Sequence, residues 1–188
     1  MIEVRPGGRR RIDRVLAPGY VADLDALDLA EVRARRDDAA QEETDLSYLR
    51  RLLHGRIDIV LAEQKRRHDG EGASVVEQLA TILSDKAVAA TGSGRHQVLE
   101  PSRAEAHRRH VEALVSDADL SDVSALPDDR LDLALRTYRA EEASVSQRRR
   151  EVQQVVDLLN EQIGNRYRAG SASVDDLLAA ERQKRGQG

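Results

Sequence analysis

The 188-residue chain has no cysteine, no phenylalanine and no tryptophan, and only four tyrosines. Without cysteine, disulfide bonds, thiolate nucleophiles and cysteine-ligated zinc sites are excluded. Strands are normally enriched in aromatic and β-branched side chains, so the scarcity of aromatic residues disfavours a β-sandwich or a β-barrel. These absences favour a helical protein.

Long apolar runs and a charge excess of one sign are also missing. No stretch approaches the roughly 18 apolar residues of a transmembrane helix, and residues 1–14 lack the apolar core of a signal peptide. We therefore expect a cytoplasmic protein without a membrane partner. The 30 basic and 34 acidic residues give a formal net charge of -4, unlike a general nucleic-acid binder, so direct DNA binding is not expected.

The residues that are abundant predict long helices. Charged residues make up 34% of the chain, alongside many Ala and Leu, a composition typical of helical or coiled-coil proteins. Apolar residues recur every three or four positions over 25–67 and 128–169. The second segment contains a sustained heptad, whose members are Leu131, Leu135, Tyr138, Glu142, Val145, Arg149, Val152, Val156, Leu159 and Ile163. We predict an all-α fold: a long antiparallel two-helix coiled coil with shorter helices inserted between the two long helices.

Clusters of proline and glycine divide the chain into three predicted parts. Residues 1–24 form an arm that is flexible or docks on a partner or on the core, and it looks irregular as far as residue 21. Residues 25–170 form the helical coiled-coil domain, which we expect to bind any ligand or protein partner. Residues 171–188 form a short C-terminal helix and a tail.

Capping signals predict where the shorter helices begin. Ser74 with Glu77 and Ser102 with Glu105 are capping boxes, Ser173 opens the last helix, and the stretch 117–127 is a turn-rich link. Gly170 is expected to cap the second long helix.

One glycine lies inside the first long helix. Gly55 costs about 1 kcal/mol relative to alanine there. We therefore expect that packing or a ligand needs room at this position.

A pattern of polar residues occurs twice, once in each long helix, and we call the two copies the polar stripes. Each stripe is Glu, Ser, Arg, Gln or His, and Asp, and the copies lie 99 residues apart. At about 100° per residue, all five side chains share one narrow face that climbs about 22 Å. Two charges of this pattern occupy heptad positions, where they cost stability unless paired or used. The members are Glu43, Ser47, Arg50, His54 and Asp58, then Glu142, Ser146, Arg149, Gln153 and Asp157.

Antiparallel packing would bring the two stripes together. If residue i lies near residue 200 − i, Asp58 approaches Glu142, and Arg50 and Arg149 face each other across a pseudo-two-fold axis. Two facing guanidinium groups repel unless an anion lies between them. The stripes therefore predict an anionic ligand with two-fold symmetry, and their side chains suit guanine and phosphate groups.

Two other interpretations of the stripes stay open. Glu and Arg at these spacings are common on solvated helix faces, so the chain could be a structural coiled-coil interaction protein without a nucleotide ligand. A phosphodiesterase or other nucleotide enzyme is the third possibility. No Ser/His/Asp set, phosphate-binding glycine loop or cyclase-like motif is present, so no catalysis is expected.

His107 and His110 lie one helical turn apart, a spacing that two metal ligands could use. There is no cysteine, and the sequence places no carboxylate beside them, so we expect no metal site.

The stripes resemble the motif E-x3-S-x2-R-x3-Q-x3-D of the RsiG family, which lies on two helices of an antiparallel coiled coil. Residues 142–157 match this motif fully, and residues 43–58 match it except at His54, where the motif has Gln. The runs 46–58 and 15–20 are also similar to the family, and the resemblance covers most of residues 12–169. Because histidine can donate or accept like an amide, binding is expected to survive at His54, with some sensitivity to pH.

The resemblance implies a cyclic-di-GMP-dependent anti-sigma factor of the actinobacterial type. A stacked pair of cyclic di-GMP molecules would lie along the stripes as a regulatory ligand rather than a cofactor. The loaded protein would bind a WhiG-type sigma factor and keep it from RNA polymerase, and falling nucleotide would release sigma and turn on sporulation genes. A ligand that favours the sigma-competent state raises the affinity for sigma by linkage.

Overall fold

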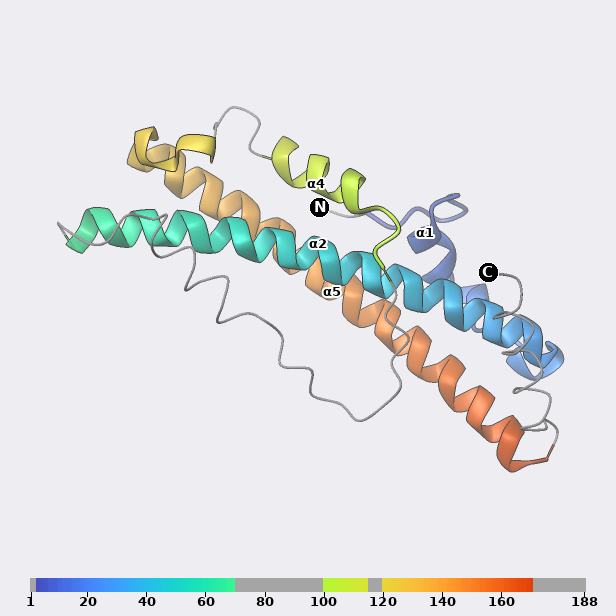
Figure 1. Cartoon of the computed structure of the whole chain (residues 1–188). Helices are drawn as coiled ribbons and strands as arrows, with labels where there is room; N and C mark the ends of the chain where they lie inside the picture. Colours follow the sequence, from blue (N-terminus) through green and yellow to red (C-terminus); the bar gives the residue numbers. More distant parts are fainter. Residues whose placement is uncertain (1–2, 70–99, 115–119, 171–188) are drawn as a thin grey trace, which may run out of the picture. The chain divides into compact units, whose positions relative to one another are not determined.

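The structure is a computed structural model that describes residues 3–69, 100–114 and 120–170. Every regular element in these ranges is a helix, which confirms the predicted all-α class (Figure 1). In chain order they are α1 (Arg11–Val15), η1 (Pro18–Tyr20), η2 (Leu24–Ala26), α2 (Leu29–Asp69), α4 (Ala104–Ala113), η3 (Leu120–Ala125) and α5 (Asp128–Arg168). In these parts of the chain, no helix combines the length and the apolar character needed to cross a bilayer.

The two long helices, α2 and α5, have 41 residues each and lie close to their predicted limits. α2 begins at Leu29 instead of residue 25, because η2 takes up the preceding residues. α5 ends at Arg168, and Gly170 follows with a φ of 70°. This left-handed conformation favours glycine, so the predicted C-terminal cap is confirmed.

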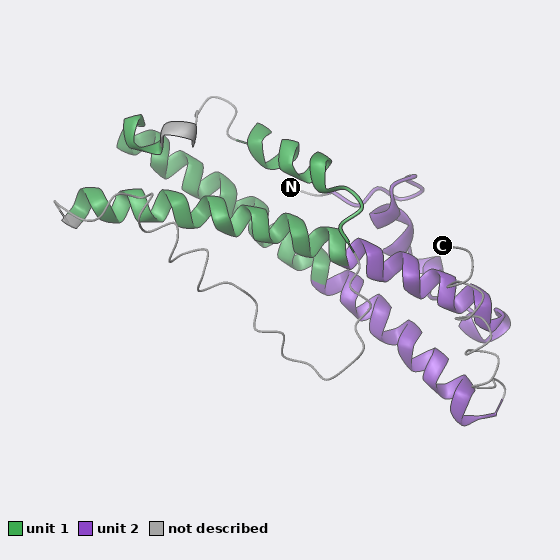
Figure 2. Ribbon diagram, viewed as in Figure 1, with its two compact units in different colours: residues 1–2, 44–149 green, residues 3–43, 150–188 purple. Residues whose placement is uncertain are grey.

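The chain divides into two compact units, and each long helix contributes to both (Figure 2). Unit 1 consists of Thr44–Arg149 with Met1–Ile2, and unit 2 consists of Glu3–Glu43 and Arg150–Gly188.

In unit 1, the apolar residues that the periodicity selected form the core between α2 and α5. They are less than 9% exposed, and several are completely buried. The buried set from the two helices is Leu46, Leu49, Leu53, Ile57, Val60, Leu131, Leu135, Tyr138 and Val145. Burying a leucine side chain contributes about 1.5–3 kcal/mol, so this seam is the main source of stability in unit 1.

Side-chain contacts show the direction of the two helices within unit 1. The contacts are His54–Glu142, Gln64–Asp132 and Arg67–Asp128. The residue number falls along α5 as it rises along α2, so these two segments run in opposite directions. Knobs-into-holes packing along the whole length of both helices stays a prediction.

The last turns of α2 carry a buried carboxylate in unit 1. Glu63 is completely buried and accepts hydrogen bonds from Arg66 and Arg67 at 2.7–2.8 Å. Arg67 also bonds Asp128 and the carbonyl oxygen of Ser124. One carboxylate thereby orients an arginine that joins the end of α2 to the start of α5.

We expect Glu63 to make the free energy of unfolding sensitive to acid. The hydrogen bond from Arg66 lowers its pKa from 4.5 to about 2; burial opposes the shift, and Arg67 adds to it. A lowered pKa stabilises the fold fully above about pH 4.5, and this contribution is lost as the pH falls toward 2. In urea unfolding, the free energy of unfolding of wild type should exceed that of Glu63→Gln at neutral pH. This difference in free energy should shrink below about pH 4.5. An equal difference in the free energy of unfolding at neutral pH and near pH 2 would contradict a stabilising role of the ionised Glu63 carboxylate.

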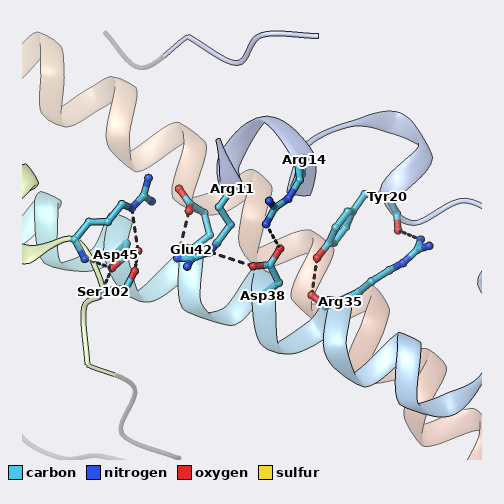
Figure 3. Close-up of polar contacts among 9 residues, drawn as sticks. Arg11, Arg14, Tyr20, Arg35, Asp38, Glu42, Asp45 and Ser102 are labelled. Carbon is cyan, nitrogen blue, oxygen red and sulfur yellow. Dashed lines mark hydrogen bonds and ion pairs between the residues drawn. The ribbon is translucent and has the colours of Figure 1, made fainter. Parts of the chain in front are cut away.

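In unit 2, the N-terminal segment packs against α2. Ile12 and Val15 of α1 are buried, and Arg11 and Arg14 both form ion pairs with Asp38 (Figure 3). The expectation that this segment is irregular as far as residue 21 is therefore wrong. A five-residue helix is too short to produce a recognisable apolar period, and it is held by contacts with a distant part of the sequence.

Two polar arrangements hold this segment in place. The hydroxyl of Tyr20 donates to the carbonyl oxygen of Arg35, and the Arg35 guanidinium donates to the carbonyl oxygen of Tyr20, at 2.8 and 2.7 Å (Figure 3). Asp13 is buried and accepts from the Arg5 amide and the Arg10 side chain. A Cβ at Gly8 would lie 2.3 Å from the Asp13 carboxylate, so this approach requires glycine.

The rest of unit 2 joins the end of α5 to the start of α2. Val152, Val156 and Leu159 are buried, as the heptad predicts. The side chain of Arg33 donates to the hydroxyl of Tyr167 and lies over its ring at 5.7 Å from the centroid.

Helix α4 belongs to unit 1 and does not begin as predicted. Its N-cap is Arg103, with no side-chain capping bond. Ser102 instead donates its amide and its hydroxyl to Asp45 of α2, both at 2.6 Å (Figure 3). The predicted capping box of Ser102 and Glu105 is therefore wrong, because the buried carboxylate of Asp45 on another helix accepts the hydrogen bonds of Ser102.

Several other predictions lie outside the described residues or only partly within them. The helix that opens at Ser74 and the one that opens at Ser173 lie outside them. The link 117–127, predicted to be rich in turns, is described from residue 120, where it contains η3.

Candidate functional site

The ten residues of the two polar stripes all lie in α2 and α5. Nine of them are half-buried, and Asp157 is exposed. They flank the buried seam and remain reachable from solvent. Unit 1 holds Ser47, Arg50, His54, Asp58, Glu142, Ser146 and Arg149, and unit 2 holds Glu43, Gln153 and Asp157.

Glu142 connects the two stripes within unit 1. Its Oε1 lies 3.2 Å from the Nε2 of His54 on α2 and accepts a hydrogen bond of 2.6 Å from the hydroxyl of Ser146 on its own helix. The side chains of His54 and Glu142 are 40% and 21% exposed. A ligand that reached this carboxylate would have to exchange with protein donors already in place.

The part of the α5 stripe that lies in unit 2 has a contact within its own helix. The Gln153 amide donates to the Asp157 carboxylate at 3.0 Å, within α5. Two equivalent positions of the repeat, His54 and Gln153, therefore make different contacts.

The contacts within unit 1 also fix the register of α2 against α5. In the contacts His54–Glu142, Gln64–Asp132 and Arg67–Asp128, the two residue numbers add up to 195 or 196. The predicted pairing of residue i with residue 200 − i is therefore shifted by about one helical turn. Glu142 contacts His54, where the symmetric pairing placed Asp58.

This register changes which stripe residues are opposite one another. It aligns Ser47 with Arg149 and Arg50 with Ser146, so the arginines are offset along the helices instead of facing each other. The spacing of Glu, Ser, Arg and His is the same when read in reverse, which is why an antiparallel pair matches each Arg with a Ser. The pseudo-two-fold relation survives, with its centre between these two pairs.

The arginines of the stripes contain buried donors. The Nε atoms of Arg50 and Arg149 are both buried, and that of Arg50 has no hydrogen-bond partner among the residues described. A buried N–H without an acceptor costs about 1–3 kcal/mol. A ligand oxygen or ring nitrogen would remove that cost after the side chain turns to expose this atom.

Gly55 lies one residue beyond His54 on α2. A Cβ built at this glycine meets no heavy atom within 4 Å. Of the two explanations that the sequence left open, packing is therefore excluded for the described residues. The expectation that a ligand needs the space stays a prediction.

The carboxylate that anchors α4, Asp45, was not among the residues predicted from the sequence. Asp45 is completely buried and is contacted by Ser102 and by Arg103, whose Nε lies 3.1 Å away. Burial alone raises the pKa of Asp45, but the Ser102 hydrogen bonds and the charge of Arg103 outweigh it and lower the pKa. Asp45 is two residues from Glu43, or about 200° around the helix, so α4 occupies the face of α2 away from the stripe.

The two histidines considered as metal ligands belong to this anchoring of α4. His107 is buried, and burial lowers its pKa. His110 lies 3.0 Å from the buried carboxylate of Glu141. Within the described ranges, no three His, Cys, Asp or Glu side chains are placed to hold a metal ion.

The fold is that of an all-helical protein built on two long helices, with the polar stripes along the seam between them. The RsiG-like family model matches residues 18–83 and 117–183, which include both stripes. The chain belongs to the RsiG-like family. This membership indicates an anti-sigma factor with a sigma factor as partner, in a family not known for enzymes. A search of curated proteins found no match.

Proposed function

We propose that the chain is an anti-sigma factor controlled by cyclic di-GMP, which binds through the two polar stripes. When loaded, it sequesters a WhiG-type sigma factor and represses sporulation genes. The observation that carries the proposal is the duplicated stripe, with a buried Nε of Arg50 that has no acceptor in the described part of the chain.

The residue types of the stripes suit the chemistry of the ligand. A guanidinium can donate two hydrogen bonds to the O6/N7 edge of guanine or bind a phosphate. A carboxylate can accept from the N1–H and N2–H₂ groups of guanine, and Ser or Gln can bond phosphate or ribose oxygens. Each stripe offers one set of these groups, and two antiparallel stripes present them to a two-fold symmetric dinucleotide.

Nucleotide binding would act on the sigma factor through the helix pair. A ligand that bonds side chains of both α2 and α5 favours the one arrangement of the helices in which these bonds can form. If that arrangement also binds sigma, each ligand raises the affinity for the other by the same factor. Coupling between nucleotide binding and sigma binding then requires no conformational change outside the helix pair.

A capture experiment tests this function directly. We expect the immobilised full chain to retain a purified WhiG-type sigma factor in the presence of cyclic di-GMP and to release it when the nucleotide is removed. A sigma factor of a different class serves as the control for specificity. Equal retention with and without cyclic di-GMP would contradict nucleotide control, and no retention in either case would contradict the choice of partner.

A further inference from the structure

The contact between His54 and Glu142 is a cross-helix bridge between the two stripes in unit 1. The two side-chain atoms are 3.2 Å apart, and both side chains are partly exposed. The same oxygen of Glu142 also accepts from Ser146. The carboxylate that a ligand donor would seek is therefore already bonded in the ligand-free protein.

The repeat places a different residue type at the equivalent position of the other stripe. Gln153 has a neutral amide, and it donates within its own helix to Asp157. An imidazole takes up a proton in the range around neutral pH, whereas an amide does not. Only the stripe of α2 therefore carries an imidazole at this position.

The charges around His54 come from both helices of unit 1. On α2, Arg50 and Arg51 lie about one turn before it and Asp58 one turn after it. On α5, Glu142 is in contact with it, and Arg149 lies two turns further along. The group that a charged imidazole would pair with directly is the Glu142 carboxylate.

We propose that the His54–Glu142 bridge is a latch that competes with the nucleotide, and that protonation of His54 strengthens it. The affinity of this chain for cyclic di-GMP therefore falls as the pH falls. This inference rests on the nucleotide site proposed above, and it adds a proton as a second signal at that site.

The direction in which pH changes the nucleotide affinity follows from the partner of the imidazole. A charged His54 without a partner would attract the phosphates and raise the affinity. Bonded to Glu142, its charge is compensated, and the carboxylate is held by an ion pair, which is stronger than the hydrogen bond from a neutral imidazole. The nucleotide must break that ion pair before it can bond the carboxylate. Protonation of His54 therefore lowers the affinity for the nucleotide.

Isothermal titration of the full chain with cyclic di-GMP tests the latch. From about pH 8 to about pH 5.5, the wild-type affinity should fall by about three- to fivefold, the range expected for a partly exposed ion pair. In His54→Gln the change should be less than about twofold. The matched control is His110→Gln, which removes another His–Glu contact between helices, that with Glu141, away from the stripes. It should keep the wild-type pH dependence.

A wild-type affinity that is constant or rises toward acid pH would overturn the latch. So would a pH dependence that persists unchanged in His54→Gln. Absence of binding at every pH would instead overturn the proposed nucleotide site.

The latch itself is tested without nucleotide by thermal unfolding. Glu142→Gln should lower the Tm of the ligand-free protein more at about pH 5.5 than at about pH 8, because only a charged imidazole loses an ion pair. In a His54→Gln background this difference should disappear. Equal Tm shifts at both pH values would overturn the latch whether or not the nucleotide binds.

Discussion

Arg149→Ala should lower the affinity for cyclic di-GMP by about 100-fold. Each hydrogen bond from a charged group contributes about 1.5–3 kcal/mol, and loss of two such bonds to the ligand would remove about 3 kcal/mol. Removal of this charge also leaves the anionic ligand with one fewer compensating cation. The affinity of the purified variant can be measured by isothermal titration at fixed pH and salt.

Arg136→Ala is the matched control for this variant. Arg136 is an exposed arginine of the same helix, and it lies about 120° around the helix from Glu142. We expect its removal to leave the affinity within about twofold of wild type. If Arg149→Ala bound the nucleotide as tightly as Arg136→Ala does, the stripe of α5 would not be the binding surface.

Leu53→Ala should lower the free energy of unfolding by about 3 kcal/mol. Leu53 is completely buried in the seam of unit 1, and truncation of a buried leucine costs about 2–5 kcal/mol, depending on how far the cavity collapses. For a chain of this size the Tm should fall by about 6–12 °C. Urea unfolding followed by circular dichroism measures the change directly.

Leu133→Ala makes the same chemical change at a leucine that is 46% exposed. We expect it to cost less than about 1 kcal/mol. Equal losses in the two variants would mean that the seam between α2 and α5 is not the core of unit 1.

The fold class and the seam could be predicted because periodicity reports burial. Leucines and valines at three- and four-residue spacing predicted both long helices, and the residues at these positions are buried in the structure. The glycine after α5 predicted its end for an equally local reason, since only glycine adopts that conformation at little cost. Such signals depend on neighbours in the sequence.

The docking of the short helices could not be predicted in this way. α1 and α4 are held by Asp38 and Asp45 of α2, and a carboxylate in a helical sequence gives no sign of whether it is solvated or bonded to a distant segment. Ser102 had a plausible local partner in Glu105, but the buried Asp45 is the acceptor it uses. Long-range polar contacts of this kind override local capping preferences.

The candidate site was predictable as a set of residues but not as an arrangement. The repeat relates Glu142 to Glu43 and gives each stripe its face. It does not fix the axial register, which the apolar side chains of the seam decide. The observed shift of about one turn places His54 against Glu142, and the latch follows from that shift.

Guanine recognition by the paired stripes can be tested by equilibrium binding of labelled cyclic di-GMP to the full chain, with cyclic di-AMP as competitor. Both nucleotides carry the same two phosphates, so only the bases differ. We expect saturable binding of cyclic di-GMP that excess unlabelled cyclic di-GMP displaces and cyclic di-AMP does not. No saturable binding, or equal displacement by both, would contradict guanine recognition by the paired stripes.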